Sequence, residues 1–167
     1  MKLTLLPMLF MLCSSVFAQD SEATFNRAEA LFANGEYDEA SKLYTDVISQ
    51  DSENMNAYLR RAFCMSVLKD YDKAIEDYSF VIEQHPTHPF AYLSRGSAYN
   101  KKEQWKLALA DFDKVLSLDP KNQEAYNNRG WAKNGLGLHD EACKDWKTSR
   151  KLGNAEAKII LKNNSCK

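Results

Sequence analysis

The sequence repeats with a strict period of 34 residues. One alanine position recurs in this period, at Ala40, Ala74, Ala108 and Ala142. One arginine position does the same, at Arg27, Arg61, Arg95 and Arg129. Two unlike residue types in one fixed period indicate a single structural unit that is copied four times. A period of this length is typical of solenoids, in which each repeat packs only on its neighbours.

Each repeat combines two apolar stretches with helical spacing, joined by a short polar turn. In the second repeat these stretches are Ala57–Leu68 and Tyr71–Glu83. Small residues recur where two helices must approach closely, at Ala28, Ala62, Gly96 and Gly130. The chain has only 6 glycines and 4 prolines, which suits long helices. The sequence therefore predicts an all-α fold with repeats at 21–54, 55–88, 89–122 and 123–156, followed by a capping helix over about 154–163.

This pattern resembles the tetratricopeptide repeat, a 34-residue helix-turn-helix unit marked by aromatic, small and proline residues. The aromatic marks are Tyr58, Tyr92 and Tyr126, and Pro86 and Pro120 follow the second helices. The resemblance covers residues 21–156 and implies a right-handed α-α superhelix that binds other proteins. Asn154 is expected to cap the last helix, and Ala155, Ile159 and Ile160 are expected to cover the fourth repeat.

The first 18 residues form a separate segment, predicted to be a signal peptide. Lys2 supplies a positive end, the stretch from Leu3 to Phe17 is apolar, and Val16 and Ala18 suit a cut before Gln19. A membrane anchor is the alternative, but the stretch is shorter than the roughly 20 residues that span a bilayer. We therefore expect export to the periplasm or outside the cell. The fourth repeat and tail are similar to exported tetratricopeptide proteins of Gram-negative bacteria of the Bacteroidetes type.

The charge and the motifs argue against most other function classes. The formal net charge of −1 gives no reason to expect nucleic acid or an anionic membrane surface. The sequence contains no phosphate loop, zinc-protease helix or nucleophile elbow, so we expect no enzyme and no cofactor. His85 and His88 lie among prolines in a loop and lack a third ligand, so we expect no metal site.

The recurring arginines allow two interpretations. They could form a row that binds an anionic ligand, or they could pair with the aspartates that share their period, Asp77, Asp111 and Asp145. The matched periods favour structural ion pairs that involve Arg61, Arg95 and Arg129. The sequence leaves open whether each pair lies within one repeat or joins two repeats.

The resemblance implies that the first helix of each repeat lines a concave groove. The candidate peptide-binding residues are Phe25, Glu29, Leu59, Phe63, Phe90, Leu93, Ser97, Asn127 and Trp131. The apolar members are either exposed anchors for a partner or part of the core between helices. The basic and amide residues that hold acidic C-terminal tails in chaperone-binding relatives are absent. We therefore expect an apolar or mildly basic peptide segment of another protein. The alternative function is a scaffold that associates through its ends or its convex face.

Cys143 and Cys166 are candidates for a disulfide. They lie ten residues before and thirteen residues after Gly153, so an antiparallel turn there would bring the sulfurs to a similar height. Two free thiols, or a bridge between two molecules, are the alternatives. Cys64 lies at a packed helical position, which predicts a buried and unreactive thiol.

Overall fold

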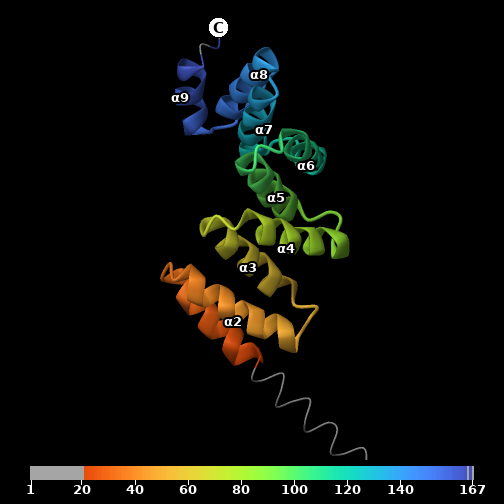
Figure 1. The fold of residues 1–167 in the computed structure, drawn as a ribbon. Helices are drawn as coiled ribbons and strands as arrows, with labels where there is room; N and C mark the ends of the chain where they lie inside the picture. Colours follow the sequence, from red (N-terminus) through yellow and green to blue (C-terminus); the bar gives the residue numbers. More distant parts are fainter. Residues whose placement is uncertain (1–20, 165, 167) are drawn as a thin grey trace, which may run out of the picture. The chain divides into compact units, whose positions relative to one another are not determined.

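The computed structural model describes residues 21–164 and 166, and this part of the chain contains helices and no strand (Figure 1). A first helix covers residues 21–33. The helices that follow are α2 (Tyr37–Gln50), α3 (Met55–Val67), α4 (Tyr71–Gln84), α5 (Pro89–Lys101), α6 (Trp105–Leu118), α7 (Gln123–Gly135), α8 (His139–Lys151) and α9 (Ala155–Asn163). The predicted signal peptide, residues 1–18, lies outside the described residues.

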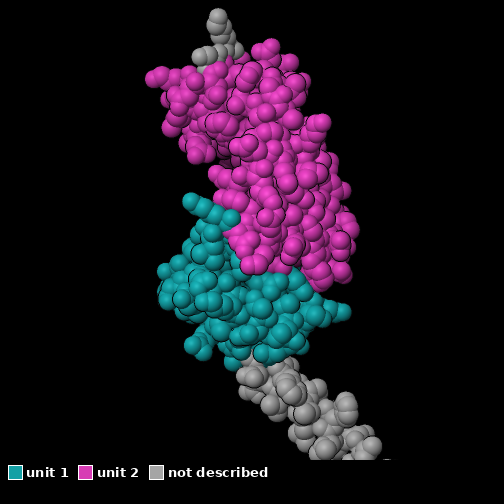
Figure 2. Space-filling view, in the orientation of Figure 1, with its two compact units in different colours: residues 1–69 teal, residues 70–167 magenta. Residues whose placement is uncertain are grey.

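The chain divides into two compact units, residues 1–69 and 70–167, which Figure 2 shows in different colours. We call them the N-terminal unit and the C-terminal unit. Among its described residues, the N-terminal unit contains the first helix, α2 and α3. The C-terminal unit contains α4 to α9.

Side-chain caps explain where many helices begin. The side chain of the residue before the helix accepts a hydrogen bond from a backbone N–H of the first turn, which would otherwise have no partner. The caps are Asn54 for α3, Asp70 for α4, His88 for α5, Asn122 for α7 and Asn154 for α9. His88 caps α5 through Nδ1, 3.2 Å from the N–H of Ala91.

The turn inside each repeat has one residue with a positive φ angle, and these residues are again 34 apart. They are Gly35, Lys69, Glu103 and Gly137. The left-handed conformation is cheap for glycine and costs other residues about 1–2 kcal/mol. Lys69 and Glu103 therefore hold an unfavourable backbone conformation at φ 66° and 58°.

Small residues and large rings interlock in the core of the C-terminal unit. Gly96 on α5 faces the ring of Phe112, and Gly130 on α7 faces the ring of Trp146. A Cβ atom at Gly96 would lie 2.8 Å from Phe112, and one at Gly130 would lie 2.4 Å from Trp146. Both rings are fully buried, so the two glycines are needed for close helix packing.

The core of the N-terminal unit is built around Tyr44, which is fully buried. Its hydroxyl donates a hydrogen bond to the carboxylate of Glu29. The pKa of Tyr44 is raised, chiefly by burial and to a smaller extent by this hydrogen bond. Glu29 also pairs with Arg60, with 3.0 Å between Oε1 and Nε. Phe25 packs edge-on against Tyr44, with ring centroids 5.7 Å apart.

Helix α9 packs against α8 and closes the C-terminal unit. Its buried residues are Ala157, Ile160 and Leu161, and the last two pack on Trp146. The expectation that Ile159 covers the fourth repeat is wrong, because Ile159 is 61% exposed. The buried residues follow the i, i+3, i+4 spacing of one helical face, and Ile159 lies off that face.

A disulfide links Cys143 on α8 to Cys166, just beyond the end of α9. Their Cα atoms are 5.5 Å apart. The bond ties the C-terminal end of the chain to the helix on which α9 packs. Cys64 is buried as a free thiol in the N-terminal unit.

Candidate functional site

The arginines of the C-terminal unit bind aspartates of their own repeat. Arg95 donates to both carboxylate oxygens of Asp111, at 2.9 and 2.7 Å. Arg129 donates in the same two-pronged way to Asp145, at 2.8 and 2.7 Å. The hydrogen bonds to Asp111 raise the pKa of Arg95. Both guanidinium groups are therefore committed to structural pairs and are not free to bind an anionic ligand.

Each of these arginines also reaches back to the preceding repeat. Arg95 donates to Ser79 Oγ at 3.0 Å, and Arg129 donates to Asp113 Oδ1 at 2.7 Å. In the N-terminal unit, Arg61 makes the equivalent contact with Thr45 Oγ1 at 3.1 Å. The pairing that the sequence left open therefore runs in both directions. Asp77 lies in the other compact unit from Arg61, so their predicted pair stays a prediction.

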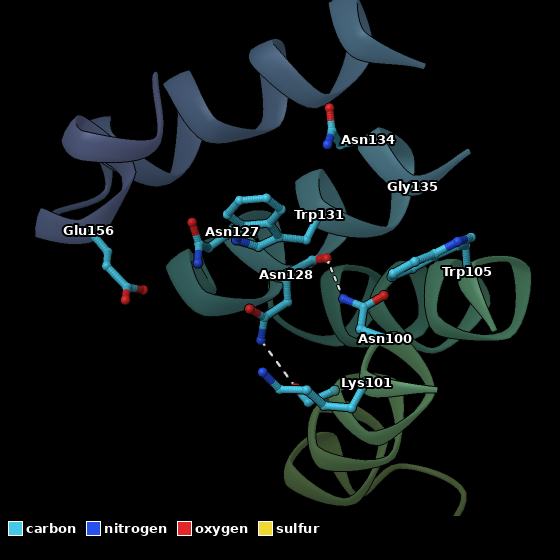
Figure 3. A pocket seen from close by; sticks show the side chains of 10 residues that line it. Asn100, Lys101, Trp105, Asn127, Asn128, Trp131, Asn134, Gly135 and Glu156 are labelled. Atoms are coloured by element: carbon cyan, nitrogen blue, oxygen red, sulfur yellow. Dashed lines mark hydrogen bonds between the residues drawn. The ribbon is translucent and has the colours of Figure 1, made fainter. Parts of the chain in front are cut away.

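The C-terminal unit contains a pocket of about 650 Å³ (Figure 3). Helices α5 and α7 form most of its walls, the start of α6 adds one tryptophan, and α9 adds one glutamate. The lining residues are Ser97, Asn100, Lys101, Trp105, Asn127, Asn128, Trp131, Asn134, Gly135 and Glu156. The pocket thus combines two indole rings with four amide side chains and one charge of each sign.

A chain of hydrogen bonds fixes one wall of the pocket. Asn100 Nδ2 donates to the backbone carbonyl of Asn128 at 2.9 Å, and Asn128 Nδ2 donates to Ser97 Oγ at 3.2 Å. The Ser97 hydroxyl in turn donates to the carbonyl of Leu93 at 2.9 Å. Figure 3 shows the first two of these bonds crossing between α5 and α7. The contact to a carbonyl also fixes which way the Asn100 amide points, because only its nitrogen can donate.

Two buried acceptor atoms of the pocket residues have no partner within the described part of the chain. They are Asn100 Oδ1 and Asn127 Oδ1. Asn127 is only 4% exposed. A buried polar atom without a hydrogen bond costs about 1–3 kcal/mol, so such atoms call for a partner. Both oxygens are buried, so a ligand can bond to them only if these amide side chains move.

Each of the two indole rings of the pocket packs against another residue of the unit. Trp131 packs edge-on against Trp146, with ring centroids 5.2 Å apart, and is still 40% exposed. Trp146 is anchored by a hydrogen bond from Nε1 to the carbonyl of Asn127, at 3.1 Å. Trp105 lies against Gly135, where a Cβ atom would be 2.5 Å from the ring. These contacts fix the two rings in place, so their apolar surface is available to a ligand in a defined position.

Three models of the tetratricopeptide repeat match the chain, at residues 31–93, 89–122 and 112–144. Together the matches run from residue 31 to residue 144, which is more than half of the chain. The chain belongs to the tetratricopeptide repeat family. The predicted all-α solenoid fold is confirmed.

Solved structures of other tetratricopeptide proteins have a similar fold. A MamA double mutant matches with a TM-score of 0.81 and 19% identity, over 86% of this chain and 82% of that one. MamA from Desulfovibrio magneticus RS-1 matches with a TM-score of 0.76 and 22% identity, over 79% and 75%. YrrB, described as a TPR protein with an unusual peptide-binding site, matches with a TM-score of 0.79 and 15% identity, over 86% and 74%. At these identities the likeness shows the fold alone. No curated protein sequence matches this chain.

Three of the predicted groove residues of this tetratricopeptide protein line the pocket, namely Ser97, Asn127 and Trp131. Leu93 does not, and of the two alternatives left open for the apolar groove residues, the structure assigns it to the core. Leu93 is only 9% exposed and belongs to a core cluster with Phe112. Phe90 is exposed beside His88, outside the set of pocket residues.

The other predicted groove residues lie in the N-terminal unit. Phe25 and Glu29 contact the core residue Tyr44, so both contribute to the structure of that unit. Phe63 is partly exposed and contacts the ring of Phe32, with centroids 5.2 Å apart. Leu59 is half-buried. A single groove through both units stays a prediction.

The sequence did not identify several residues of the pocket. Asn128 follows a predicted position directly, and Lys101 lies at the end of its helix. Trp105 belongs to a second helix, and Glu156 belongs to the capping helix, so neither fits a rule about first helices. The asparagines of α7 were the signal in the sequence that could have indicated the pocket, because amides are less common than apolar residues on a packed helix.

The described residues contain no group of three or more histidine, cysteine or acidic side chains that could hold a metal ion. In the same part of the chain, no helix is long and apolar enough to cross a membrane.

Proposed function

We propose that the pocket of the C-terminal unit binds a peptide segment of a partner protein. The tetratricopeptide fold is a protein–protein interaction module, and the proposal assigns that role to this site. The observation that carries it is a pocket in which the exposed ring of Trp131 lies among amide side chains and one charge of each sign. An extended peptide supplies both complements, since its backbone N–H groups donate hydrogen bonds and its side chains bury apolar surface.

The charges of the pocket favour an apolar or mildly basic segment. Lys101 is the single cation among the described lining residues, and Glu156 is the single anion. Arg95 and Arg129 are held by aspartates, so they do not add positive charge for an acidic tail. An acidic C-terminal segment would therefore find little to bind it.

A photo-crosslinker placed in the pocket tests this proposal in cells. Lys101→p-benzoylphenylalanine puts the probe on the pocket wall, and Leu107→p-benzoylphenylalanine is the matched control on α6, because Leu107 is exposed and does not line the pocket. We expect a crosslinked partner from the first position alone, and we expect Trp131→Ala to remove it while circular dichroism shows an intact fold. Equal crosslinking from both positions, or a crosslink that survives Trp131→Ala, would contradict pocket binding.

A scaffold that associates through its C-terminal end is the second candidate function. Ile159 favours it, because this side chain is 61% exposed on the outer face of α9. Sedimentation velocity at several concentrations would reveal self-association. If Ile159→Glu leaves the sedimentation coefficient unchanged, α9 is not the contact.

We also propose that the protein is exported. The disulfide between Cys143 and Cys166 supports this proposal, because such bonds persist in oxidising compartments and are rare in the cytosol. The apolar segment before Gln19 supports it independently. N-terminal sequencing of the protein from cell fractions would give Gln19 as the first residue; a cytosolic protein that starts at Met1 would refute export.

A further inference from the structure

We infer that the pocket selects a basic side chain, lysine or arginine, in the segment that it binds. The inference rests on the proposed peptide binding and adds the side chain that the pocket recognises. It names Glu156 and Trp131 as the residues that would hold the cationic group.

On one wall of the pocket, the side-chain donors already bond to protein oxygens. The amide nitrogens of Asn100 and Asn128 already donate to protein oxygens, and so does the hydroxyl of Ser97. The unpartnered buried atoms are both oxygens, Asn100 Oδ1 and Asn127 Oδ1. Both of these oxygens are buried, whereas the exposed Glu156 carboxylate is an acceptor that a ligand can reach. Lysine and arginine side chains have only donors, so they complement this carboxylate better than an acidic or a neutral apolar side chain does.

The charge at one wall of the pocket has the sign that a cation requires. Glu156 projects from the first turn of α9, and no ion pair of Glu156 is present among the described residues. Figure 3 shows its carboxylate and the Asn127 amide at the same end of the pocket, away from Trp105. The opposite charge, Lys101, comes from α5, so the two charges stand on different walls. A basic side chain is therefore drawn toward Glu156 and repelled from the wall of Lys101.

An aromatic face completes the site. Trp131 is exposed toward the pocket, while its contact with Trp146 fixes the ring from the other side. A cation over an indole face is attracted by the negative potential of the ring, and tryptophan is the best of the aromatic residues for this contact. The pocket thus brings together an anion and an exposed indole ring.

Titrations of the purified protein with three blocked peptides test the inference. The probes are acetyl-Ser-Ala-X-Ala-Ser-amide, where X is lysine, norleucine or glutamate, so that only the charge of one side chain changes. Binding is followed by NMR through the indole N–H signal of Trp131 and the side-chain amide signal of Asn127. We expect the lysine peptide to bind about fivefold more tightly than the norleucine peptide, and the glutamate peptide to bind most weakly.

Two charge-neutralising variants separate the pocket wall from a general charge effect. Glu156→Gln should abolish the preference for lysine over norleucine, whereas the matched control Lys101→Gln should keep it. Equal binding of the lysine and norleucine peptides would overturn the inference and leave peptide binding intact. A lysine preference that survives Glu156→Gln, or no shift of the pocket signals at millimolar peptide, would also overturn it. The crosslinking experiment decides the proposed function independently.

Discussion

Gly130 offers the sharpest test of how the repeats pack. A Cβ atom at this position would lie 2.4 Å from Nε1 and 2.7 Å from Cδ1 of Trp146. These distances are shorter than any normal contact, so Gly130→Ala must displace the ring. The ring has no free space, because Trp146 is fully buried and packs on Ile160 and Leu161. Its hydrogen bond to the Asn127 carbonyl would be strained as well.

The net effect follows from three contributions to the free energy of unfolding. Alanine gains about 1 kcal/mol over glycine from helix propensity. Overpacking in a full core costs about 1–3 kcal/mol. Loss of the Trp146 hydrogen bond costs about 1 kcal/mol more. We therefore expect Gly130→Ala to destabilise the C-terminal unit by about 1–3 kcal/mol, although alanine is the better helix former.

Gly135→Ala is the matched control on the same helix. A Cβ atom there would lie 2.5 Å from the ring of Trp105, which is as close as at Gly130. Trp105, however, is half-buried and lines the pocket, so its ring can move into open space. We expect a change of less than about 1 kcal/mol, because the contact is relieved and helix propensity is gained.

Amide hydrogen exchange measured by mass spectrometry is the appropriate assay. Repeat arrays can unfold in parts, so a single unfolding midpoint does not assign a loss to one helix pair. In Gly130→Ala, exchange should accelerate in α7 and α8 and stay unchanged in α2. If the two glycine variants lose the same stability, or Gly130→Ala is as stable as the parent protein, the packing argument is wrong.

Three further predictions concern other features of the fold. Cys166→Ser removes the disulfide to Cys143, which has a sequence separation of 23, and by loop-closure entropy this should lower the free energy of unfolding by about 3 kcal/mol. Amide exchange in α9 should therefore accelerate, and reduction of the parent protein should have the same effect. Glu103→Gly removes an unfavourable backbone conformation at φ 58° and should stabilise the C-terminal unit by about 0.5–1 kcal/mol, seen as a higher urea midpoint. Burial raises the pKa of Cys64 to about 11, so iodoacetamide at pH 8 should label this thiol only after unfolding. Because the thiol ionises at lower pH in the unfolded chain, the stability that the buried neutral thiol contributes is lost as the pH rises toward 11.

The fold was predictable because its strictest repeats are packing requirements. All four alanines of the periodic series are fully buried, which explains why no larger residue replaces them. The glycines that face Phe112 and Trp146 follow the same logic. A residue that must be small in one repeat must be small in all of them, since each repeat packs in the same way on its neighbour.

The exposure of groove positions was harder to predict. Leu93 and Asn127 occupy equivalent positions of successive repeats, and both are buried, whereas their counterpart Leu59 is half-buried. This position lies at the edge between the core and the open face of the first helix. Its exposure depends on the neighbouring side chains, which the period does not specify.

The sequence pattern did not reveal the second partner of each arginine, and the reason is chemical. The residues that lie 16 positions before the arginines are Thr45, Ser79 and Asp113. They share an oxygen acceptor and differ in residue type, so they do not stand out as a repeat. A search for the recurring property, an acceptor at this spacing, would have found them.

The pocket is built from positions at which the repeats differ. The position of Trp131 is occupied by Glu29, Phe63 and Ser97 in the other repeats, and the position of Asn128 is occupied by Asn26, Arg60 and Ser94. Apart from the hydrogen bond between Asn128 and Ser97, such side chains contribute little to the contacts between helices, because the buried alanines, glycines and aromatic rings already supply them. They can therefore change without loss of the fold, as long as the small residues behind them stay. Trp131 is the exception in this site, because it touches both the pocket and the core ring of Trp146. A change at this one residue should affect binding and stability together, whereas a change at Glu156 should affect binding alone.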